Sequence, residues 1–364
     1  MAEPVRIDKF EIISTNPPGY YQLWKDKSGG STFLPELIIL SKDDTGIESI
    51  SYLVHPELYQ LISDADIASV SSNGKLRVIL SRNANHNTVL VTERCNNLCS
   101  FCSQPPKQGN DDWLLGQAMS ALADFNFEGV VGVSGGEPLL YGQRFIDFLD
   151  FVKEFSPKTE LHILTNGRAF SNLDFTKEIA SRLGDMHFSF GVPLYSTNAN
   201  VHDELVGAKG AFSETVKGII NAGNLGLNIE LRYIPTKNNS DDLPNLIEYA
   251  NRIFSNIAQI SMMNLEPMGW ARKNWESLYI SPLEYSSTIL RSIRASNFGV
   301  IPLVLFNYPL CHLDQVAWSY AVKSISDWKN HYPVGCEGCR MINSCGGYFA
   351  SAEGKYLDEP RKIQ

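Results

Sequence analysis

The stretch TERCNNLCSFCSQPP (residues 92–106) decides how the rest of the chain is interpreted. It places Cys95, Cys99 and Cys102 four and then three residues apart, among polar and turn-prone residues that directly follow an apolar strand-like run. Thiolates on one short loop can converge on a single iron–sulfur cluster. The stretch therefore predicts a metal centre just beyond the end of a strand.

Length, charge and cysteine content limit the class of protein. The 364 residues predict one large α/β domain with appended parts. The net charge of −9 and the lack of a basic run argue against a nucleic-acid partner. Because the N-terminal residues lack a signal-peptide pattern and the apolar runs are short, we expect a cytoplasmic protein without membrane contact. In that reducing compartment, the seven cysteines indicate metal binding or catalysis rather than disulfides.

Strands and helices alternate through the middle of the chain. Six apolar strands are expected near 87–93, 129–134, 160–165, 187–194, 228–235 and 259–266, separated by helices near 111–125, 142–155, 173–183, 211–224 and 242–255. This alternation predicts an α/β fold with a parallel sheet, as in a barrel or a partial (β/α)6 barrel.

The flanking regions have other patterns. Residues 1–80 should form a small β-rich N-terminal module, with strands near 10–14, 33–40, 49–54 and 75–80. The barrel should occupy residues 81–281. Residues 282–364 should form a cysteine-bearing C-terminal subdomain that begins with a helix and includes a strand near 299–306.

Further motifs follow the next strands, where parallel α/β folds carry their chemistry. In SGGEP, Gly135 and Gly136 would let the backbone approach a ligand, and Glu137 could pair with a cationic amino group. Alone, this motif could equally be a simple turn. After the third strand, TNG should turn the chain, either with Asn166 facing the pocket or as a plain turn.

The cysteine motif, with Phe101 in its aromatic position, and the SGGEP motif together resemble the signature of the radical S-adenosylmethionine superfamily. The resemblance implies a 4Fe–4S cluster held by the three cysteines, with an open iron that chelates S-adenosylmethionine, and Glu137 as the partner of its amino group. It also implies cleavage to a 5′-deoxyadenosyl radical that removes a hydrogen from substrate. The alternative is a zinc site, for which His86 is the only local fourth ligand.

Other positions follow the family less closely. Ser189 matches a serine that lies near the cofactor carboxylate in relatives, although FGVPLYS replaces the usual residues after it. Peptide-modifying relatives carry an arginine after an HD pair, whereas His202 and Asp203 are followed by ELVG. We therefore expect Arg232 to contact the carboxylate, with a salt bridge as its alternative role. Met262 and Met263 should fill the core, or pass the adenine with their backbone.

The C-terminal subdomain carries a second thiol group. CEGCRMINSCGG supplies Cys336, Cys339 and Cys345, and Cys311 lies 25 residues upstream of the first of them. Four thiolates suit either a tetrahedral zinc or a 4Fe–4S cluster. The spacing resembles the SPASM and twitch extensions of radical enzymes that act on peptides. This resemblance implies one auxiliary 4Fe–4S cluster, with zinc as the alternative.

A narrower resemblance runs from about residue 70 to the C-terminus. HNTVLVTERCNNLCSFCSQPPK, FGVPLYS, EPMGWA and the cysteine-bearing tail are similar to the C-type His-Xaa-Ser system radical S-adenosylmethionine maturases. This implies a peptide or small-protein substrate, partner maturase subunits and an electron donor, and the N-terminal module could bind the peptide by strand addition. The alternatives are a radical enzyme acting on a small molecule and a cluster-binding, non-catalytic subunit of a maturase complex.

Overall fold

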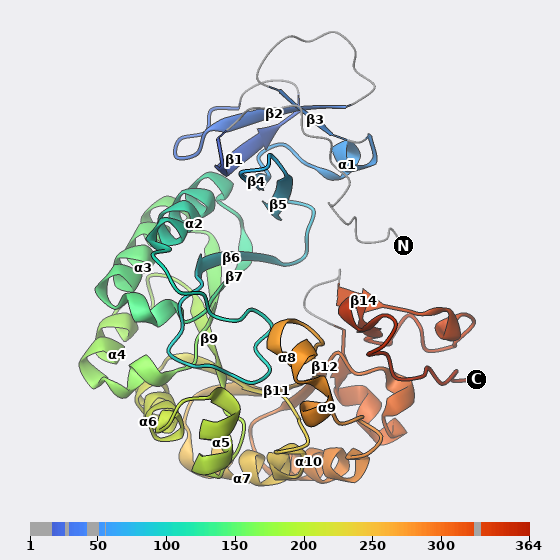
Figure 1. Cartoon of the computed structure of the whole chain (residues 1–364). Helices are drawn as coiled ribbons and strands as arrows, with labels where there is room; N and C mark the ends of the chain where they lie inside the picture. The colour runs from blue at the N-terminus through green and yellow to red at the C-terminus, as the bar shows by residue number, and fades with distance from the viewer. Residues whose placement is uncertain (1–16, 26–28, 42–50, 55, 324–328) are drawn as a thin grey trace.

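One parallel sheet organises the computed structural model, which describes residues 17–25, 29–41, 51–54, 56–323 and 329–364 (Figure 1). Its strand order is β13-β12-β11-β10-β9-β8-β7-β6, and neighbouring strands run parallel. The six strands predicted from the sequence are β6 (Asn87–Thr92), β7 (Gly129–Gly135), β8 (Thr159–Leu164), β9 (Phe188–Pro193), β10 (Asn228–Tyr233) and β11 (Ile257–Met263). The predicted α/β class with a parallel sheet is confirmed.

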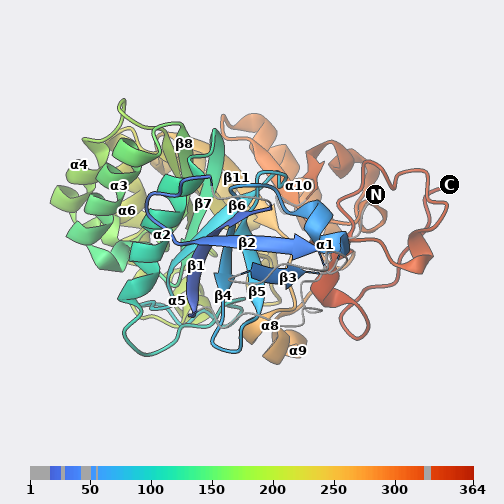
Figure 2. The same ribbon diagram turned by 90° about the horizontal axis from the view of Figure 1, so that it is seen from above.

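Helices cover the outer face of this sheet, as Figures 1 and 2 show for α2, α3, α4 and α6. The five predicted helices are α2 (Asp112–Phe125), α3 (Gln143–Phe155), α4 (Leu173–Ala180), α6 (Ala211–Asn224) and α7 (Leu243–Ile253). Alternate strand residues face opposite sides of a sheet. In β10, Ile229 and Leu231 are fully buried in the main core, whereas Arg232 lies half-buried on the other face. The inner face is therefore the polar one.

The alternation continues past the predicted barrel limit at residue 281. Helix α10 (Ser286–Phe298) is followed by β12 (Leu303–Phe306), which matches the strand expected near 299–306 and pairs with β11. The two-residue strand β13 (Ala321–Val322) then pairs with β12. Part of the region predicted as a separate subdomain thus extends the barrel sheet. The sequence pattern also missed α5 (Ala199–Val206), a short helix between β9 and α6.

The N-terminal module is a mixed sheet in the order β3-β2-β1-β4-β5. The predicted runs at 33–40, 49–54 and 75–80 correspond to β2 (Glu36–Ser41), β3 (Ser51–Val54) and β5 (Leu76–Leu80). The expectations missed β1 (Gly19–Trp24) and β4 (Ile67–Val70), and the run at 10–14 lies outside the described residues. A separate apolar cluster, which includes Leu23, Leu37 and Ile39, forms the core of this module.

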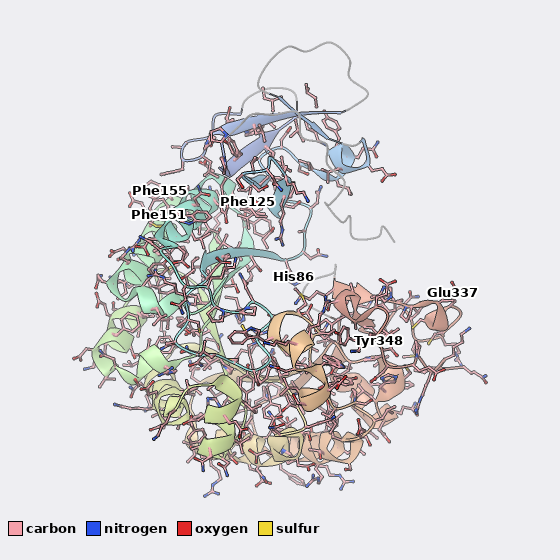
Figure 3. The ribbon with its side chains drawn as sticks, in the orientation of Figure 1. His86, Phe125, Phe151, Phe155, Glu337 and Tyr348 are labelled. Atoms are coloured by element: carbon pink, nitrogen blue, oxygen red, sulfur yellow. The ribbon has the colours of Figure 1, made fainter. Side chains whose placement is uncertain are left out.

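The module is docked on the barrel through the end of α2 and the side of α3. The carboxylate of Asp124 accepts hydrogen bonds from four groups of residues 31–34: Ser31 Oγ at 2.6 Å and the backbone N–H groups of Thr32, Phe33 and Leu34 at 2.7–3.1 Å. Beside this contact, the Phe33 ring packs edge-on against Phe151 and Phe155 of α3, with ring centroids 5.6 and 5.0 Å apart. Figure 3 shows Phe151 and Phe155 on the side of the barrel near the module.

The remainder of the C-terminal region consists mainly of turns and short 3-10 helices around the four cysteines. Within it, strand β14 (Asn330–His331) pairs antiparallel with strand β15 (Tyr348–Phe349). A compact segment with little secondary structure is common where metal ligands supply part of the stability.

Among the described residues, no helix combines the length and apolar character needed to cross a membrane.

Replacing Asp124 with Ala should weaken the docking of the N-terminal module. The substitution removes a charged acceptor of several hydrogen bonds at a half-exposed site, so we expect the free energy of unfolding to fall by about 1–2 kcal/mol. Denaturant unfolding combined with limited proteolysis measures the change. Asp147→Ala on the exposed face of α3 is the matched control and should behave like the parent. Equal stability and protease resistance in both variants would contradict the docking role.

Candidate functional site

Cys95, Cys99 and Cys102 lie on the loop between β6 and α2, at the carboxyl end of the sheet. Two backbone N–H groups of this loop, those of Leu98 and Ser100, donate to carbonyls of the last turn of α5 at 2.8 and 2.9 Å. On the other side, the N–H of Trp270 in α8 (Gly269–Lys273) donates to the Cys102 carbonyl at 2.8 Å. The loop is therefore fixed by backbone contacts to segments far away in the sequence.

The glycines of SGGEP bring the end of β7 against this loop. The Gly136 N–H donates to the Thr92 carbonyl and the Glu137 N–H donates to the Arg94 carbonyl, both at 2.8 Å. A Cβ atom on Gly136 would lie only 2.1 Å from the Arg94 carbonyl oxygen, and one on Gly135 would lie 2.9 Å from the Thr92 oxygen. The close approach predicted for these glycines is thus made to the chain's own backbone.

The three thiols are half-buried and influence one another. Burial, followed by the neighbouring thiols Cys102 and Cys95, raises the pKa of Cys99 to about 12. Burial likewise raises the pKa of Cys95 to about 11, although the Asn97 N–H donates to its sulfur at 3.3 Å. A bound cation would reverse these shifts, because metal ligation requires the thiolate. Three neighbouring thiols with an N–H···S contact fit an iron–sulfur cluster.

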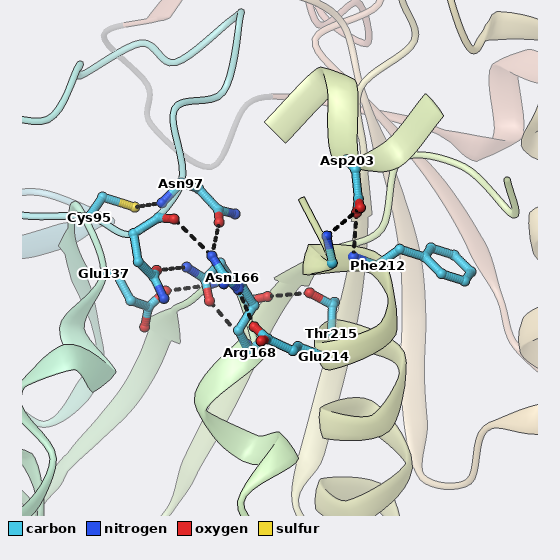
Figure 4. Close-up of polar contacts among 12 residues, drawn as sticks. Cys95, Asn97, Glu137, Asn166, Arg168, Asp203, Phe212, Glu214 and Thr215 are labelled. Atoms are coloured by element: carbon cyan, nitrogen blue, oxygen red, sulfur yellow. Dashed lines mark hydrogen bonds and ion pairs between the residues drawn. The ribbon is translucent and has the colours of Figure 1, made fainter. Parts of the chain in front are cut away.

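Glu137 is 1% exposed and lies beside the cysteine loop (Figure 4). Its Oε1 accepts from the Leu139 N–H at 2.9 Å and from Thr165 Oγ1 at 2.7 Å, and its Oε2 accepts from the Asn166 N–H at 2.5 Å. Burial raises the pKa of this carboxyl, and these donors oppose the shift. Because a carboxylate offers about four acceptor positions, one position on Oε2 is left for a cationic group.

Asn166 and Arg168 connect the end of β8 to the cysteine loop. Asn166 Nδ2 donates to Asn96 Oδ1 at 2.6 Å. Arg168 Nη1 donates to the Asn96 carbonyl at 2.8 Å and to Asn97 Oδ1 at 2.7 Å, while its Nε lies 2.6 Å from Glu214 of α6 (Figure 4). The Asn166 side chain therefore faces the cysteine loop. Sequence reasoning missed Arg168, although its place directly after TNG was the available signal.

The Phe101 side chain is buried beneath the cysteine loop and does not face solvent. It is 5% exposed and meets Tyr195 edge-to-face, with the ring centroids 4.8 Å apart. It belongs to a small apolar cluster with Leu205, Val206 and Leu265, against which Cys99 also packs. The aromatic position of the motif thus holds the cysteine loop on the barrel.

Ser189 does not lie with the cysteines. It is the second residue of β9, near the opposite end of the sheet, and its Oγ is 2.9 Å from His162 Nδ1. His162 Nε2 is in turn 3.0 Å from Glu230 Oε2. Burial would raise the pKa of Glu230, but hydrogen bonds from His162 and Ser261 and the charge of Arg232 lower it to about 2. Ser189 is thus part of a polar network on the inner face of the barrel.

Arg232 lies near the carboxyl end of β10, also on the inner face. Its Nη2 is 2.8 Å from the Met263 sulfur, and within the described part of the chain no carboxylate lies within ion-pair distance of its guanidinium. Its charge acts on Glu230 and on the buried Tyr195 beneath the cysteine loop. Met262 is fully buried in the core, so only Met263 faces Arg232. The Met263 thioether carries no charge, so the positive charge of Arg232 is available to bind an anionic group.

The other residues noted in the sequence have local structural roles. His202 is 1% exposed, and its Nδ1 accepts from the Tyr195 N–H at 3.2 Å. Asp203 accepts from the N–H groups of Gly210 and Phe212, at 2.5 and 2.7 Å, where α6 begins (Figure 4). Both side chains stabilise the segment that carries the last turn of α5.

His86, which is labelled in Figure 3, precedes β6, whereas the three cysteines follow this strand in the sequence. The six residues of this strand span about 20 Å at 3.3 Å per residue. His86 is therefore too far away to complete a tetrahedral zinc site with the three cysteines.

The four C-terminal cysteines line one cavity with an empty volume of about 330 Å³, open solvent included. Burial raises the pKa of Cys336 to about 11, with smaller contributions from the other three thiols. The thiol of Cys311 differs: burial would raise its pKa, but hydrogen bonds from His312, Arg361 N–H and Tyr348 lower it to about 7. Cys345 Sγ accepts from the Leu310 and Gly347 N–H groups, each at 3.3 Å.

These four thiols form a ligand set that suits two different groups. A tetrahedral zinc takes all four thiolates on one ion, whereas in a 4Fe–4S cluster each thiolate binds a different iron. Four thiols around one cavity, with N–H···S bonds to Cys345, are compatible with either group.

Comparison with known proteins defines the class of the central domain. Residues 89–250 match the model of the Radical SAM superfamily. This match contains the cysteine loop, SGGEP and the ends of β6 to β10, and it confirms the superfamily resemblance for this part of the chain. Residues 89–250 are therefore similar to the radical SAM superfamily domain.

The individual proteins that match this chain have low sequence identity to it. A probable GTP 3′,8-cyclase from Pyrobaculum aerophilum is 24% identical over 266 residues, which cover 70% of this chain and 78% of that protein. A GTP 3′,8-cyclase from Campylobacter jejuni subsp. doylei is 29% identical over 192 residues, covering 50% of this chain and 57% of the relative. Among solved structures, Streptococcus suis SuiB bound to S-adenosylmethionine gives a TM-score of 0.43 at 15% identity, over 61% of this chain and 47% of that chain.

Replacing Arg168 with Met should loosen the cysteine loop. The change removes two hydrogen bonds to the loop and the ion pair to Glu214, so we expect less iron bound at Cys95, Cys99 and Cys102 after anaerobic reconstitution. Iron counting and the visible absorbance of the cluster measure the loss, in a background with alanine at the four C-terminal cysteines. Arg182→Met, which breaks an outer ion pair with Asp150, is the control. Equal iron in both variants would show that Arg168 does not position the loop.

Proposed function

We propose that this chain is a radical S-adenosylmethionine enzyme whose catalytic centre is the loop of Cys95, Cys99 and Cys102. The observation that carries the proposal is the joint placement of three neighbouring thiols and the buried Glu137 at the carboxyl ends of adjacent strands, inside the matched domain. Three thiolates leave one iron of a 4Fe–4S cluster free for the cofactor. When bound, this group supplies the electron that cleaves S-adenosylmethionine to a radical able to remove a hydrogen atom from substrate.

The chain's own residues would bind and orient the cofactor. Glu137 would use its remaining acceptor position on Oε2 for the methionine ammonium group, which also relieves the electrostatic cost of the buried carboxylate. Arg232 would pair with the methionine carboxylate, because among the described residues its guanidinium is hydrogen-bonded only to the Met263 thioether. Asn166 and Arg168 would keep the cysteine loop in place.

The tail would hold an auxiliary 4Fe–4S cluster through Cys311, Cys336, Cys339 and Cys345. The shared cavity and the N–H···S contacts to Cys345 support this assignment, and a tetrahedral zinc is the alternative. Four protein ligands leave no iron open, so this cluster would carry electrons rather than bind substrate. An external one-electron donor would be required to reduce the catalytic centre.

For the substrate, we propose a small molecule of the nucleotide class. The support comes from the relatives of the matched region, which are named GTP 3′,8-cyclases. The chain spans 57% of the length of the Campylobacter relative, so the substrate of that protein is a guide to chemical class only.

A peptide substrate, as in the His-Xaa-Ser maturases with a SPASM-like tail, is the second candidate. The observation that favours it is the N-terminal module, in which β5 lies at the edge of the five-stranded sheet. An edge strand can pair with an extended peptide through its backbone groups. In this case the protein would work with partner maturase subunits that present the peptide.

The substrate class can be separated by product analysis. The anaerobically reconstituted full chain would be mixed with S-adenosylmethionine, dithionite and either GTP or a synthetic peptide of His-Xaa-Ser repeats. We expect GTP to increase the rate of 5′-deoxyadenosine formation, and Cys99→Ala to abolish it. Stimulation by the peptide alone would establish the second candidate. Absence of 5′-deoxyadenosine from a fully loaded protein would contradict enzymatic function and favour a non-catalytic cluster-binding subunit.

Replacing Arg232 with Met should weaken cofactor binding while preserving the cluster. Loss of one charged hydrogen bond, worth about 1.5–3 kcal/mol, corresponds to a roughly 10- to 150-fold higher Kd for S-adenosylmethionine. Equilibrium binding to the reconstituted protein provides the measurement, with the exposed Arg252→Met as control. An unchanged Kd in Arg232→Met would assign the carboxylate contact to another residue.

A further inference from the structure

We propose that Tyr348 donates a hydrogen bond to the sulfur of Cys311 and thereby raises the reduction potential of the cluster at the tail cysteines. The inference rests on the auxiliary cluster of the proposed function. Tyr348 lies on β15, and its hydroxyl oxygen is 3.6 Å from Cys311 Sγ. Figure 3 shows Tyr348 between the barrel and the outer part of the C-terminal region, where Glu337 lies.

The neighbouring histidine determines where the Tyr348 proton points. The hydroxyl has a second neighbour, His312 Nε2, at 3.3 Å. This nitrogen is also 3.0 Å from the Glu359 carbonyl oxygen, which can only accept a hydrogen bond. His312 Nε2 therefore carries a proton and has no lone pair for Tyr348, and His312 is itself a second donor beside Cys311. Cys311 Sγ is the remaining acceptor that the structure places next to the hydroxyl.

The surroundings hold this geometry in place. Tyr348 is 6% exposed, and its ring meets the His312 ring edge-to-face at a centroid distance of 5.6 Å and an angle of 81°. On its other side, His312 Nδ1 lies 3.7 Å from the carboxylate of Asp358. Asp358 also accepts from Ser281 Oγ at 2.9 Å and from the Tyr279 hydroxyl. The donor to Cys311 is thus anchored to the barrel through His312, Asp358 and the hydroxyl groups of Ser281 and Tyr279.

The effect on the cluster follows from charge. Reduction adds one electron, part of which resides on the sulfur ligands. A donor aimed at a ligand sulfur stabilises the reduced form more than the oxidised form and so raises the potential. The N–H donors to Cys345 belong to the backbone and could be removed only by proline, which would also constrain the loop. Tyr348 is a side-chain donor, which makes its contribution measurable.

The test compares two tyrosines that line the same cavity. Tyr348→Phe removes the hydroxyl and keeps the ring. Tyr332→Phe is the matched control, because the Tyr332 hydroxyl donates to the Cys345 carbonyl at 2.6 Å and not to a sulfur. Both variants would be made in the full chain with alanine at Cys95, Cys99 and Cys102, so that only the tail cluster contributes to an EPR-monitored redox titration.

We expect a midpoint potential below the parent value in Tyr348→Phe and an unchanged value in Tyr332→Phe, at equal iron content. Replacement of Tyr348 by 3-fluorotyrosine, a more acidic donor of nearly the same shape, should shift the potential upward and provides the test if the phenylalanine variant does not load iron. Equal midpoints in the parent and the Tyr348 variants would overturn this inference alone. A parent that binds zinc or no iron would overturn the auxiliary cluster itself, and the inference with it.

Discussion

The close backbone contact between the end of β7 and the loop after β6 is the constraint on which the site depends. Gly136 can approach the Arg94 carbonyl only because it lacks a Cβ atom, and the adjacent Glu137 N–H donates to the same carbonyl. This contact fixes the position of the cysteine loop relative to the end of β7. It also directs the Glu137 side chain into the buried position where Thr165 and Asn166 hold it.

The same loop is held from the opposite side by similar means. A Cβ atom on Gly207 would lie 2.5 Å from the Leu98 carbonyl oxygen, and one on Gly269 would lie 2.5 Å from the Cys102 carbonyl oxygen. Both glycines have positive φ angles, 61° and 53°, which favour glycine on conformational grounds as well. Gly136 after β7, Gly207 between α5 and α6, and Gly269 at the start of α8 thus bring backbone against backbone around the thiols. Such contacts leave the cysteine side chains free for ligation.

The sequence was most informative where local patterns determine the structure. Apolar alternation located β6 to β11 and the five helices between them, and the motif residues 95–102 and 134–138 were assigned to the correct strand ends. It was least informative where distant residues meet. The Arg168 contacts to Asn96 and Asn97 and the position of Ser189 beside His162 depend on which strands become neighbours and at what register. The two-residue strand β13 was hard to place because a few apolar residues suit several structures equally well.

The central claim is that Cys95, Cys99 and Cys102 hold a cluster with one iron open to S-adenosylmethionine. Its most direct test is EPR spectroscopy of the reduced full chain in which alanine replaces the four C-terminal cysteines. The account predicts one cluster of about four irons per chain, with an EPR signal that changes when S-adenosylmethionine is added. A loaded cluster whose signal is indifferent to the cofactor would contradict it.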